Sequence, residues 1–107
     1  MPKPTDRETV WSKHLAETRF KGIPEYRLYT GLRCDILGEE YIWEVEWIKK
    51  WYQAIGQVAI YSALSNLKPG IILLARGKPD DKFRYLHCLA VCNKYGIRLE
   101  IVDTCKS

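Results

Sequence analysis

One short segment restricts the fold of this chain more than any other. Residues Ile71–Ala75 form an unbroken apolar run between Pro69-Gly70 and Arg76-Gly77. An apolar run of this length, without polar alternation, is typical of a strand that is buried on both faces. Segments with helical character precede and follow it, and a helix that connects two strands of one sheet makes them parallel. The run therefore predicts an α/β domain built around a doubly covered strand.

The other segments extend this prediction to the whole chain. Thr5 and Glu8 fit a capping box that opens a first helix. The expected elements are a helix over 6–20, strands over Tyr26–Thr30, Leu32–Leu37 and Tyr41–Trp47, a helix over Lys49–Asn66, a strand over Ile71–Ala75, a helix over Lys82–Tyr95 closed by Gly96, and a strand over Ile97–Val102. The order αβββαβ followed by αβ predicts a mixed sheet with helices on both faces, in which the first three strands form an antiparallel meander.

Composition restricts the class of protein. The chain has 107 residues, 47% hydrophobic and 28% charged, which suits one globular domain over 1–107. No apolar stretch approaches the length of a membrane span, and the first residues lack a secretory apolar region. We therefore expect a cytoplasmic or other intracellular protein with no membrane partner; the sequence does not distinguish a cellular from a viral origin. The net charge of +4 permits a nucleic-acid partner without requiring one.

The cysteines give no metal motif. Cys88 and Cys92 lie four residues apart in a predicted helix, but no CxxC pair or nearby histidine completes a zinc site. Cys34 and Cys105 are isolated in the sequence. We expect all four to be buried, reduced thiols. Neither a phosphate-binding glycine loop nor a recognisable nucleophile motif is present.

Acidic residues follow an alternating pattern in the predicted hairpin. A two-residue turn at Gly38-Glu39 would pair Leu37 with Glu40 and Asp35 with Ile42. Asp35, Glu44 and Glu46 then share one face. The opposite face would carry Cys34, Ile36, Trp43, Val45 and Trp47.

In this register Asp35 and Glu44 are diagonal neighbours, roughly 7–8 Å apart at the backbone. Two carboxylates at that distance repel each other unless a proton or a cation lies between them. Mg²⁺ or Mn²⁺, which prefer oxygen ligands, would suit the position. A solvated face of an ordinary hairpin gives the same alternation without any metal.

The hairpin also resembles a known active site. Arg33-Cys34-Asp35-Ile36 and, after the turn, Ile42-Trp43-Glu44-Val45-Glu46 resemble the hairpin of the PD-(D/E)XK nuclease superfamily, which has the restriction-endonuclease-like fold. That pattern is an aspartate on one strand and an acidic-x-lysine triplet on the next. The resemblance covers roughly residues 6–75. Gln57 and Tyr61 on the following helix resemble the Gln-x-x-x-Tyr element of members related to recombination exonucleases.

The resemblance implies a metal-dependent nuclease. Asp35 and Glu44 would hold Mg²⁺ or Mn²⁺ with help from the Val45 carbonyl, and Gln57 and Tyr61 would fix a ligand or a phosphate oxygen. Junction-resolving members carry a glutamate early in the opening helix. Glu8 takes that place here, and Glu17 is the alternative.

One position departs from the family pattern. Glu46 stands where lysine is usual. It would act as a base or as a further metal ligand, or else Lys49 or Lys50 would supply the missing positive charge. A third reading is a site that has lost activity. Together with Arg33, the two lysines would also contact the DNA backbone.

Two functions therefore remain open. The first is a metal-dependent DNA endonuclease, structure-selective or part of a larger complex. The second is a catalytically decayed module of the same fold that binds nucleic acid or a protein. Because cutting both strands of a duplex takes two sites, we expect a homodimer. A later basic cluster, Arg76, Lys78, Lys82 and Arg84, would extend a DNA surface or simply be a solvated helix start.

Overall fold

Five strands form one sheet in the order β1-β2-β3-β4-β5 in the computed structural model, which describes residues 1–106. The elements are α1 (Glu8–Thr18), β1 (Ile23–Pro24), β2 (Ile36–Leu37), β3 (Tyr41–Trp47), the 3₁₀ turn η1 (Ile48–Lys50), α2 (Trp51–Ser65), β4 (Lys68–Ala75), α3 (Asp81–Tyr95) and β5 (Arg98–Asp103). Strands β1 to β3 are antiparallel, and β3 to β5 are parallel. The predicted element order and the mixed sheet are confirmed.

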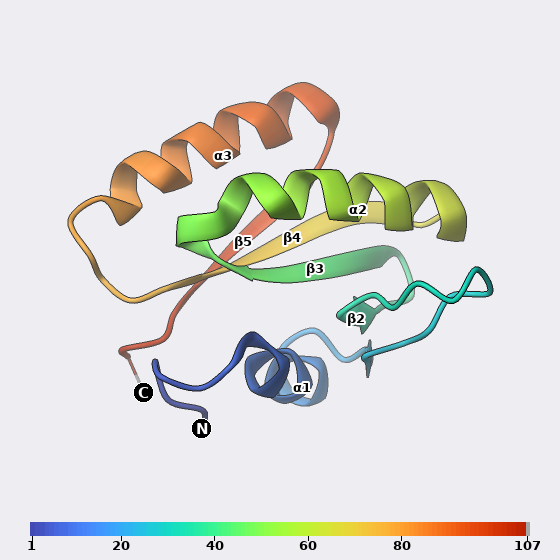
Figure 1. Ribbon diagram of the computed structural model, residues 1–107, viewed down its shortest axis with the longest axis horizontal. Coiled ribbons are helices and arrows are strands. Elements are labelled where there is room, and N and C mark those ends of the chain that lie inside the picture. The colour runs from blue at the N-terminus through green and yellow to red at the C-terminus, as the bar shows by residue number, and fades with distance from the viewer. Residues whose placement is uncertain (107) are drawn as a thin grey trace.

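The helices cover the two faces of this sheet. Figure 1 shows α1 on one side and α2 with α3 on the other. Side chains of β4 alternate between the two layers: Ile72 and Leu74 pack in the core beneath α1, and Ile71 and Leu73 pack against α2 and α3. All four are fully buried. The prediction of a strand buried on both faces is therefore confirmed.

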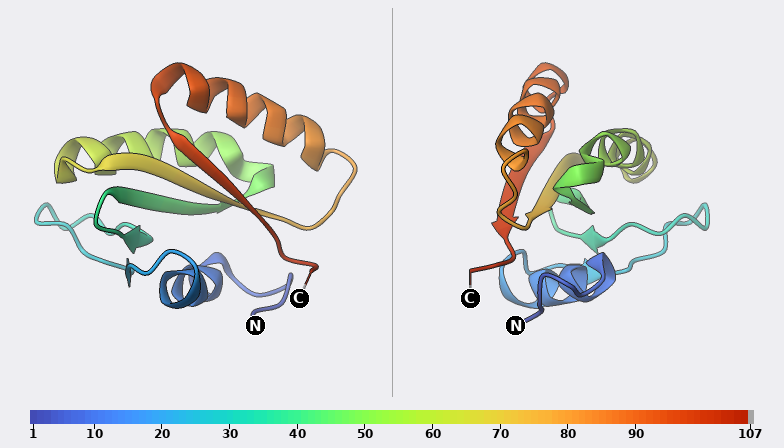
Figure 2. Two further views of the ribbon diagram at one scale, coloured as in Figure 1. Left: turned by 180° about the vertical axis from the view of Figure 1, so that it is seen from behind. Right: turned by 60° about the vertical axis from the view of Figure 1, so that its left-hand side comes forward.

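The early strands differ from the prediction. Residues 26–30 are not a strand. Instead, residues 26–33 form a tight loop in which Leu28 N–H donates to Leu32 O, and Gly31 takes a φ of 91°. Only the isolated bridge between Arg27 and Arg33 shows β-pairing there. Figure 2 shows this segment extending away from the sheet. The loop takes up residues that were predicted to form two strands. Strand β1 therefore lies earlier in the chain than predicted, at Ile23–Pro24, and β2 contains only Ile36–Leu37.

The predicted capping box is also wrong. Helix α1 begins at Glu8 after Arg7, and no side chain caps it. The residues before it form their own turn, in which Lys3 N–H donates to Asp6 Oδ2 at 2.7 Å. The indole N–H of Trp11 donates to Lys3 O at 2.9 Å and holds this turn against the helix. These contacts replace the cap that Thr5 would have supplied.

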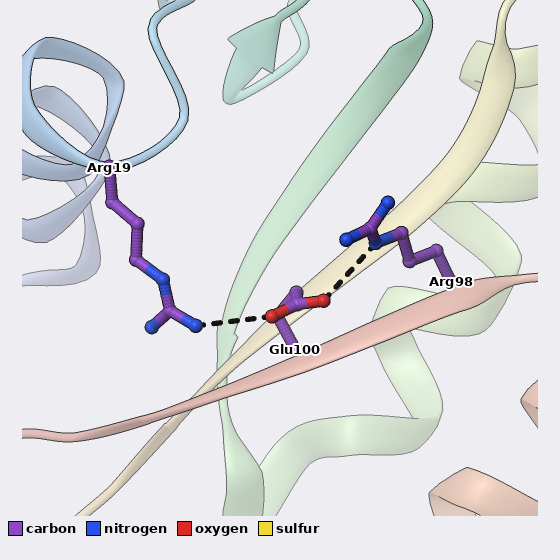
Figure 3. A network of polar contacts seen from close by, with 3 residues as sticks. All are labelled: Arg19, Arg98 and Glu100. Atoms are coloured by element: carbon purple, nitrogen blue, oxygen red, sulfur yellow. Dashed lines mark hydrogen bonds and ion pairs between the residues drawn. The ribbon is translucent and has the colours of Figure 1, made fainter.

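A polar network links α1 to the far edge of the sheet. Glu100 on β5 accepts from Arg19 and from Arg98, each at 3.1 Å (Figure 3). Because these side chains are largely solvated, each pair contributes little to stability.

The cysteines are all free of disulfides. Cys34, Cys88 and Cys92 are buried as expected, whereas Cys105 is exposed, against the prediction. Within α3, the sulfur atoms of Cys88 and Cys92 lie 3.8 Å apart. In residues 1–106, no helix combines the length and the apolar character needed to cross a bilayer.

Close packing between β3 and β4 requires glycine at one position. Gly70 pairs with Trp43 across the parallel ladder, and the indole lies over it. A Cβ on Gly70 would come within 2.5 Å of Trp43 Cε3. By contrast, a Cβ on Gly56 in α2 would meet no atom within 4 Å.

We therefore expect opposite effects from two matched substitutions. Gly70→Ala should lower the free energy of unfolding by about 1–3 kcal/mol, because the buried indole must move. Gly56→Ala should raise it by about 0.5–1 kcal/mol, because alanine favours the helix. Urea unfolding followed by circular dichroism would measure both. A neutral or stabilising Gly70→Ala would contradict the packing described for Trp43.

Candidate functional site

The acidic residues meet at the turn between β2 and β3. Leu37 pairs with Ile42 and Ile36 with Trp43, so the predicted register is wrong by two residues. Gly38 N–H donates to Tyr41 O at 2.9 Å, which puts the two-residue turn at Glu39-Glu40 rather than at Gly38-Glu39. Glycine stands at 38 because a Cβ there would meet Tyr41 O at 2.9 Å.

The register difference changes the carboxylate geometry. A shift by an even number keeps each side chain on its predicted face, so Asp35 and Glu44 still share one. Continuing the observed register places Asp35 directly opposite Glu44 instead of diagonal to it. The two carboxyl groups are close enough for Asp35 to raise the pKa of Glu44. Their predicted closeness is therefore found, and it is greater than expected.

Asp35 also completes the sheet where β2 stops. Its Oδ2 accepts a hydrogen bond of 2.7 Å from Val45 N–H, in the place where a longer β2 would have supplied a carbonyl. The chain bends at Asp35. This bend interrupts side-chain alternation, so Cys34 packs with Leu28 and Ile42 and not on the Trp43 face, as had been predicted.

Four carboxyl groups form what we call the acid cluster: Glu8, Asp35, Glu44 and Glu46. Glu44 and Glu46 come from the middle of β3 and are only 5% and 6% exposed. Glu8, the first residue of α1, lies close enough to Glu46 for that carboxyl group to raise its pKa. The cluster thus joins two contacting pairs, Asp35 with Glu44 and Glu8 with Glu46. The opening helix, the end of β2 and the centre of β3 supply them.

Burial and mutual repulsion keep protons on this cluster. The pKa of Glu44 rises far above its ordinary value, first because the carboxyl is buried and then because Asp35 is adjacent. Burial, Glu46 and Asp35 raise the pKa of Glu8 to about 8, and the Lys50 ammonium offsets part of that rise. Without a cation, the cluster therefore retains protons at neutral pH.

Tyr61 and Lys50 lie within electrostatic reach of the cluster, as predicted for site residues. Burial, together with the charges of Glu44 and Asp35, raises the pKa of Tyr61 to about 12. Gln57, one turn earlier on α2, is exposed to solvent, as is Lys49. Arg33 is also exposed and forms an ion pair of 3.3 Å with Glu25.

Glu17, the alternative to Glu8, lies on the exposed side of α1. The structure therefore brings Glu8, and not Glu17, to the acid cluster through contact with Glu46.

Sequence analysis missed a fifth acid, Glu25. Its N–H donates to Asp35 O at 2.8 Å, and its Oε1 is buried without a hydrogen-bond partner in residues 1–106. Burial and the nearby Asp35 raise its pKa. The sequence offered no signal for this residue, because Glu25 follows Pro24 outside the hairpin and reaches Asp35 only through the β1–β2 pairing.

The donor chemistry suits a hard cation held by two carboxylates. Among residues 1–106, no group of three or more His, Cys, Asp or Glu side chains is placed to hold a metal ion. The pair Asp35 and Glu44 fits a less demanding arrangement, because Mg²⁺ is commonly bound through one or two carboxylates and completes its shell with water and phosphate oxygens. A cation bound between this pair would offset the repulsion that raises the pKa of Glu44.

The raised pKa values predict how stability depends on pH in metal-free protein. Glu8 keeps its proton up to about pH 8 when folded, whereas an unfolded glutamate loses it near 4.5. Stability from this group is therefore complete below about pH 4.5 and is lost as the pH rises through about 8. The raised pKa of Glu44 also makes the folded state less stable as the pH rises.

We expect metal-free protein to unfold at lower urea concentration at pH 8 than at pH 5, and Glu44→Gln to reduce that difference. The exposed Glu39→Gln is the matched control and should keep the wild-type profile. Urea titrations across this range give the measurement. If the free energy of unfolding falls with rising pH as steeply in Glu44→Gln as in wild type, the burial of a protonated Glu44 is contradicted.

Comparison with known proteins gives one distant relative. No protein-family model and no solved structure matches the chain. A protein of Acanthamoeba polyphaga mimivirus, named "Putative KilA-N domain-containing protein", is 29% identical over 106 residues. The match covers 96% of this chain but only 28% of that protein. The chain is thus similar to a portion of a longer viral protein, whose name does not say which portion carries the KilA-N domain.

Proposed function

We propose that this chain is a divalent-metal-dependent nuclease domain that hydrolyses phosphodiester bonds in DNA. The observation that carries the proposal is the acid cluster, in which carboxyl groups lie together and, within residues 1–106, are not balanced by an equal number of cationic side chains. Burying carboxyl groups beside one another costs stability whether they are charged or protonated, and nothing in the packing of an ordinary hairpin requires it. A site whose groups have strongly perturbed pKa values is a candidate for catalysis.

The topology supports the same reading. Strands β1 to β3 form an antiparallel meander, α2 crosses over, and β4 returns parallel to β3, with α1 on the opposite face. This arrangement is the one expected for a restriction-endonuclease-like core. Asp35 and Glu44 lie where the resemblance put the metal ligands, at the meeting of β2 and β3.

The chemistry would be divided among the residues of the cluster. Asp35 and Glu44 would hold Mg²⁺ or Mn²⁺, which supplies Lewis acidity at a phosphate and lowers the pKa of a bound water. Glu46, which lies against Glu8, would take up the proton that the attacking water loses.

Two further side chains complete the proposed site. Lys50, the cation that lowers the pKa of Glu8, would offset the negative charge that develops on the phosphate. It therefore replaces the lysine that the family carries at the position of Glu46. Tyr61 stays protonated and can donate a hydrogen bond to a phosphate oxygen.

DNA is the substrate that the comparison favours. KilA-N domains are DNA-binding folds, so similarity to part of a protein named for one is compatible with action on DNA. The net charge of +4 also favours a polyanionic partner. The second candidate is a decayed domain of the same fold that binds nucleic acid or protein without cutting. Only an active domain needs a cation at Asp35 and Glu44.

Asp35→Asn and Glu44→Gln should each abolish Mn²⁺ binding and DNA cleavage, because both carboxylates contact the same cation. The side-chain amide introduced by Asp35→Asn would still offer Val45 N–H an oxygen acceptor, so the fold should persist. Glu17→Gln, which removes an exposed acid from α1, is the control and should cleave at the wild-type rate. Calorimetry with Mn²⁺ and assays on linear, nicked, branched and single-stranded DNA give the readouts.

The two outcomes separate the candidate functions. Cleavage by Asp35→Asn at the wild-type rate would overturn the active-site assignment. Wild-type protein that binds DNA but neither Mn²⁺ nor Mg²⁺ would instead favour the decayed module.

A homodimer remains our prediction for the active assembly. Each chain offers one acid cluster, and cleavage of both strands of a duplex in one binding event takes two. Light scattering of the DNA-free protein at micromolar concentration should give twice the monomer mass. Monomeric protein that still cuts both strands in one encounter would remove the reason for a dimer.

A further inference from the structure

A cavity of about 540 Å³ opens at the carboxyl ends of β3 and β4. It lies between η1, the end of β4 and the first turn of α3, and its volume suits a ligand the size of a nucleotide. Four cationic side chains line it: Lys49, Arg76, Lys78 and Arg84. Three of them belong to the basic cluster noted in the sequence. Lys82, the fourth member of that cluster, does not line the cavity.

The acidic side chains of this cavity are already paired. Asp81 accepts from Lys78 N–H at 3.0 Å and from Arg84 Nη1 at 3.2 Å. Asp80 lies 4.0 Å from Arg84. The ammonium groups of Lys49 and Lys78 have no ion-pair partner within residues 1–106. The cavity therefore presents uncompensated positive charge.

Arg76 is held in place at the wall of the cavity. Its guanidinium lies 3.5 Å from the centre of the Trp47 ring, and its Nε donates to Pro4 O at 2.9 Å. Stacking and this hydrogen bond fix the plane of the guanidinium, while its terminal amino groups stay free of both contacts. A guanidinium fixed in this way loses little further entropy when it binds a phosphate.

The cavity and the acid cluster are neighbours along β3 and η1. Glu46 belongs to the cluster, and the next residue, Trp47, lines the cavity. Lys50 lies close enough to Glu8 to lower its pKa, whereas Lys49 lines the cavity. Glu46 and Trp47 point to opposite faces of β3, so the two places meet only at its carboxyl end, where a ligand chain that passes over η1 can reach both.

We propose that this cavity binds a phosphate of the same nucleic-acid strand whose phosphodiester lies at the acid cluster, with Lys49, Lys78 and Arg76 as its anion ligands. The inference rests on the proposed function for the identity of the strand. Its role is to position the strand: a phosphate held here fixes which phosphodiester comes to Asp35 and Glu44. The apolar surfaces of Trp47 and Pro79 offer a wall for the attached sugar or base.

The test measures binding without catalysis. Wild type and the double variant Lys49→Gln/Lys78→Gln are titrated with a labelled single-stranded oligonucleotide in EDTA, across a range of salt concentrations. Both lysines are exposed, so the variant should fold, as circular dichroism would verify. The matched control is Lys13→Gln/Lys94→Gln, which removes two exposed charges outside the cavity.

We expect the cavity variant to bind about tenfold more weakly, with the salt slope reduced by about 0.7, the value for one phosphate of a single strand that is no longer neutralised. The control should bind like wild type. Equal losses in both variants would show unspecific charge attraction and overturn the proposal, as would no loss in either.

A second arm separates a strand phosphate from a free nucleotide. Thymidine monophosphate, added as competitor at concentrations equal in phosphate to the oligonucleotide, should displace it poorly. Displacement as strong as by unlabelled oligonucleotide would show a free-nucleotide site and overturn the assignment.

Because binding in EDTA requires no hydrolysis, its result is independent of the cleavage assay. If the wild-type protein does not cleave DNA but the Lys49→Gln/Lys78→Gln variant still binds the oligonucleotide more weakly, the nuclease proposal is refuted and the cavity remains a phosphate site. If the wild-type protein cleaves DNA but the variant binds the oligonucleotide as tightly as wild type, the nuclease proposal stands and the phosphate site is refuted.

Discussion

Two apolar layers meet on β4, and every other element takes its position from them. Ile72 and Leu74 need a cover on one face, which α1 supplies, and Ile71 and Leu73 need one on the other, which α2 and α3 supply. Strand β3 pairs with β4 over its whole length and is drawn into the same two layers. Burial of β4 therefore also buries the polar residues that β3 carries.

The acid cluster follows from that burial. Glu44 and Glu46 occupy a strand that the core cannot release to solvent, and β2 ends before it can cover them. The hydrogen bond from Val45 N–H to Asp35 Oδ2 closes the sheet at this point and brings a further carboxyl group to Glu44. The cost of burying these carboxyl groups is offset by apolar packing elsewhere, and in the absence of a cation, bound protons remove the charge repulsion between them.

Function, as proposed, is arranged along one short stretch of chain. From Glu44 to Lys50 the residues pass from the acid cluster, through the wall of the cationic cavity, to the lysine beside Glu8. A strand followed by a 3₁₀ turn holds these groups on rigid backbone. Rigid support is what positioning of a phosphodiester requires. The loop over residues 26–33, by contrast, extends from the sheet and contributes Arg33 only through its pair with Glu25.

Local pattern in the sequence was enough to determine the elements that periodicity and continuous apolar character define. The bounds of β3, the burial of β4, the presence of α2 and α3 and the closure of α3 at Gly96 follow from it, because these features depend on residues close in sequence. The predicted starts of α2 and β4 were wrong, because η1 takes up Lys49 and Lys50 and β4 begins at Lys68. Alternation likewise put Asp35, Glu44 and Glu46 on one face.

Tertiary structure alone decided the rest. The register of β2 against β3 depends on the close approach of Gly38 to Tyr41, and the start of α1 depends on the contact of Trp11 with Lys3. The meeting of Glu8 with Glu46, and of Lys49 with Lys78, joins residues that only the packing of helices on the sheet brings together. These last two meetings join distant parts of the chain, so no local pattern of residue types encodes them.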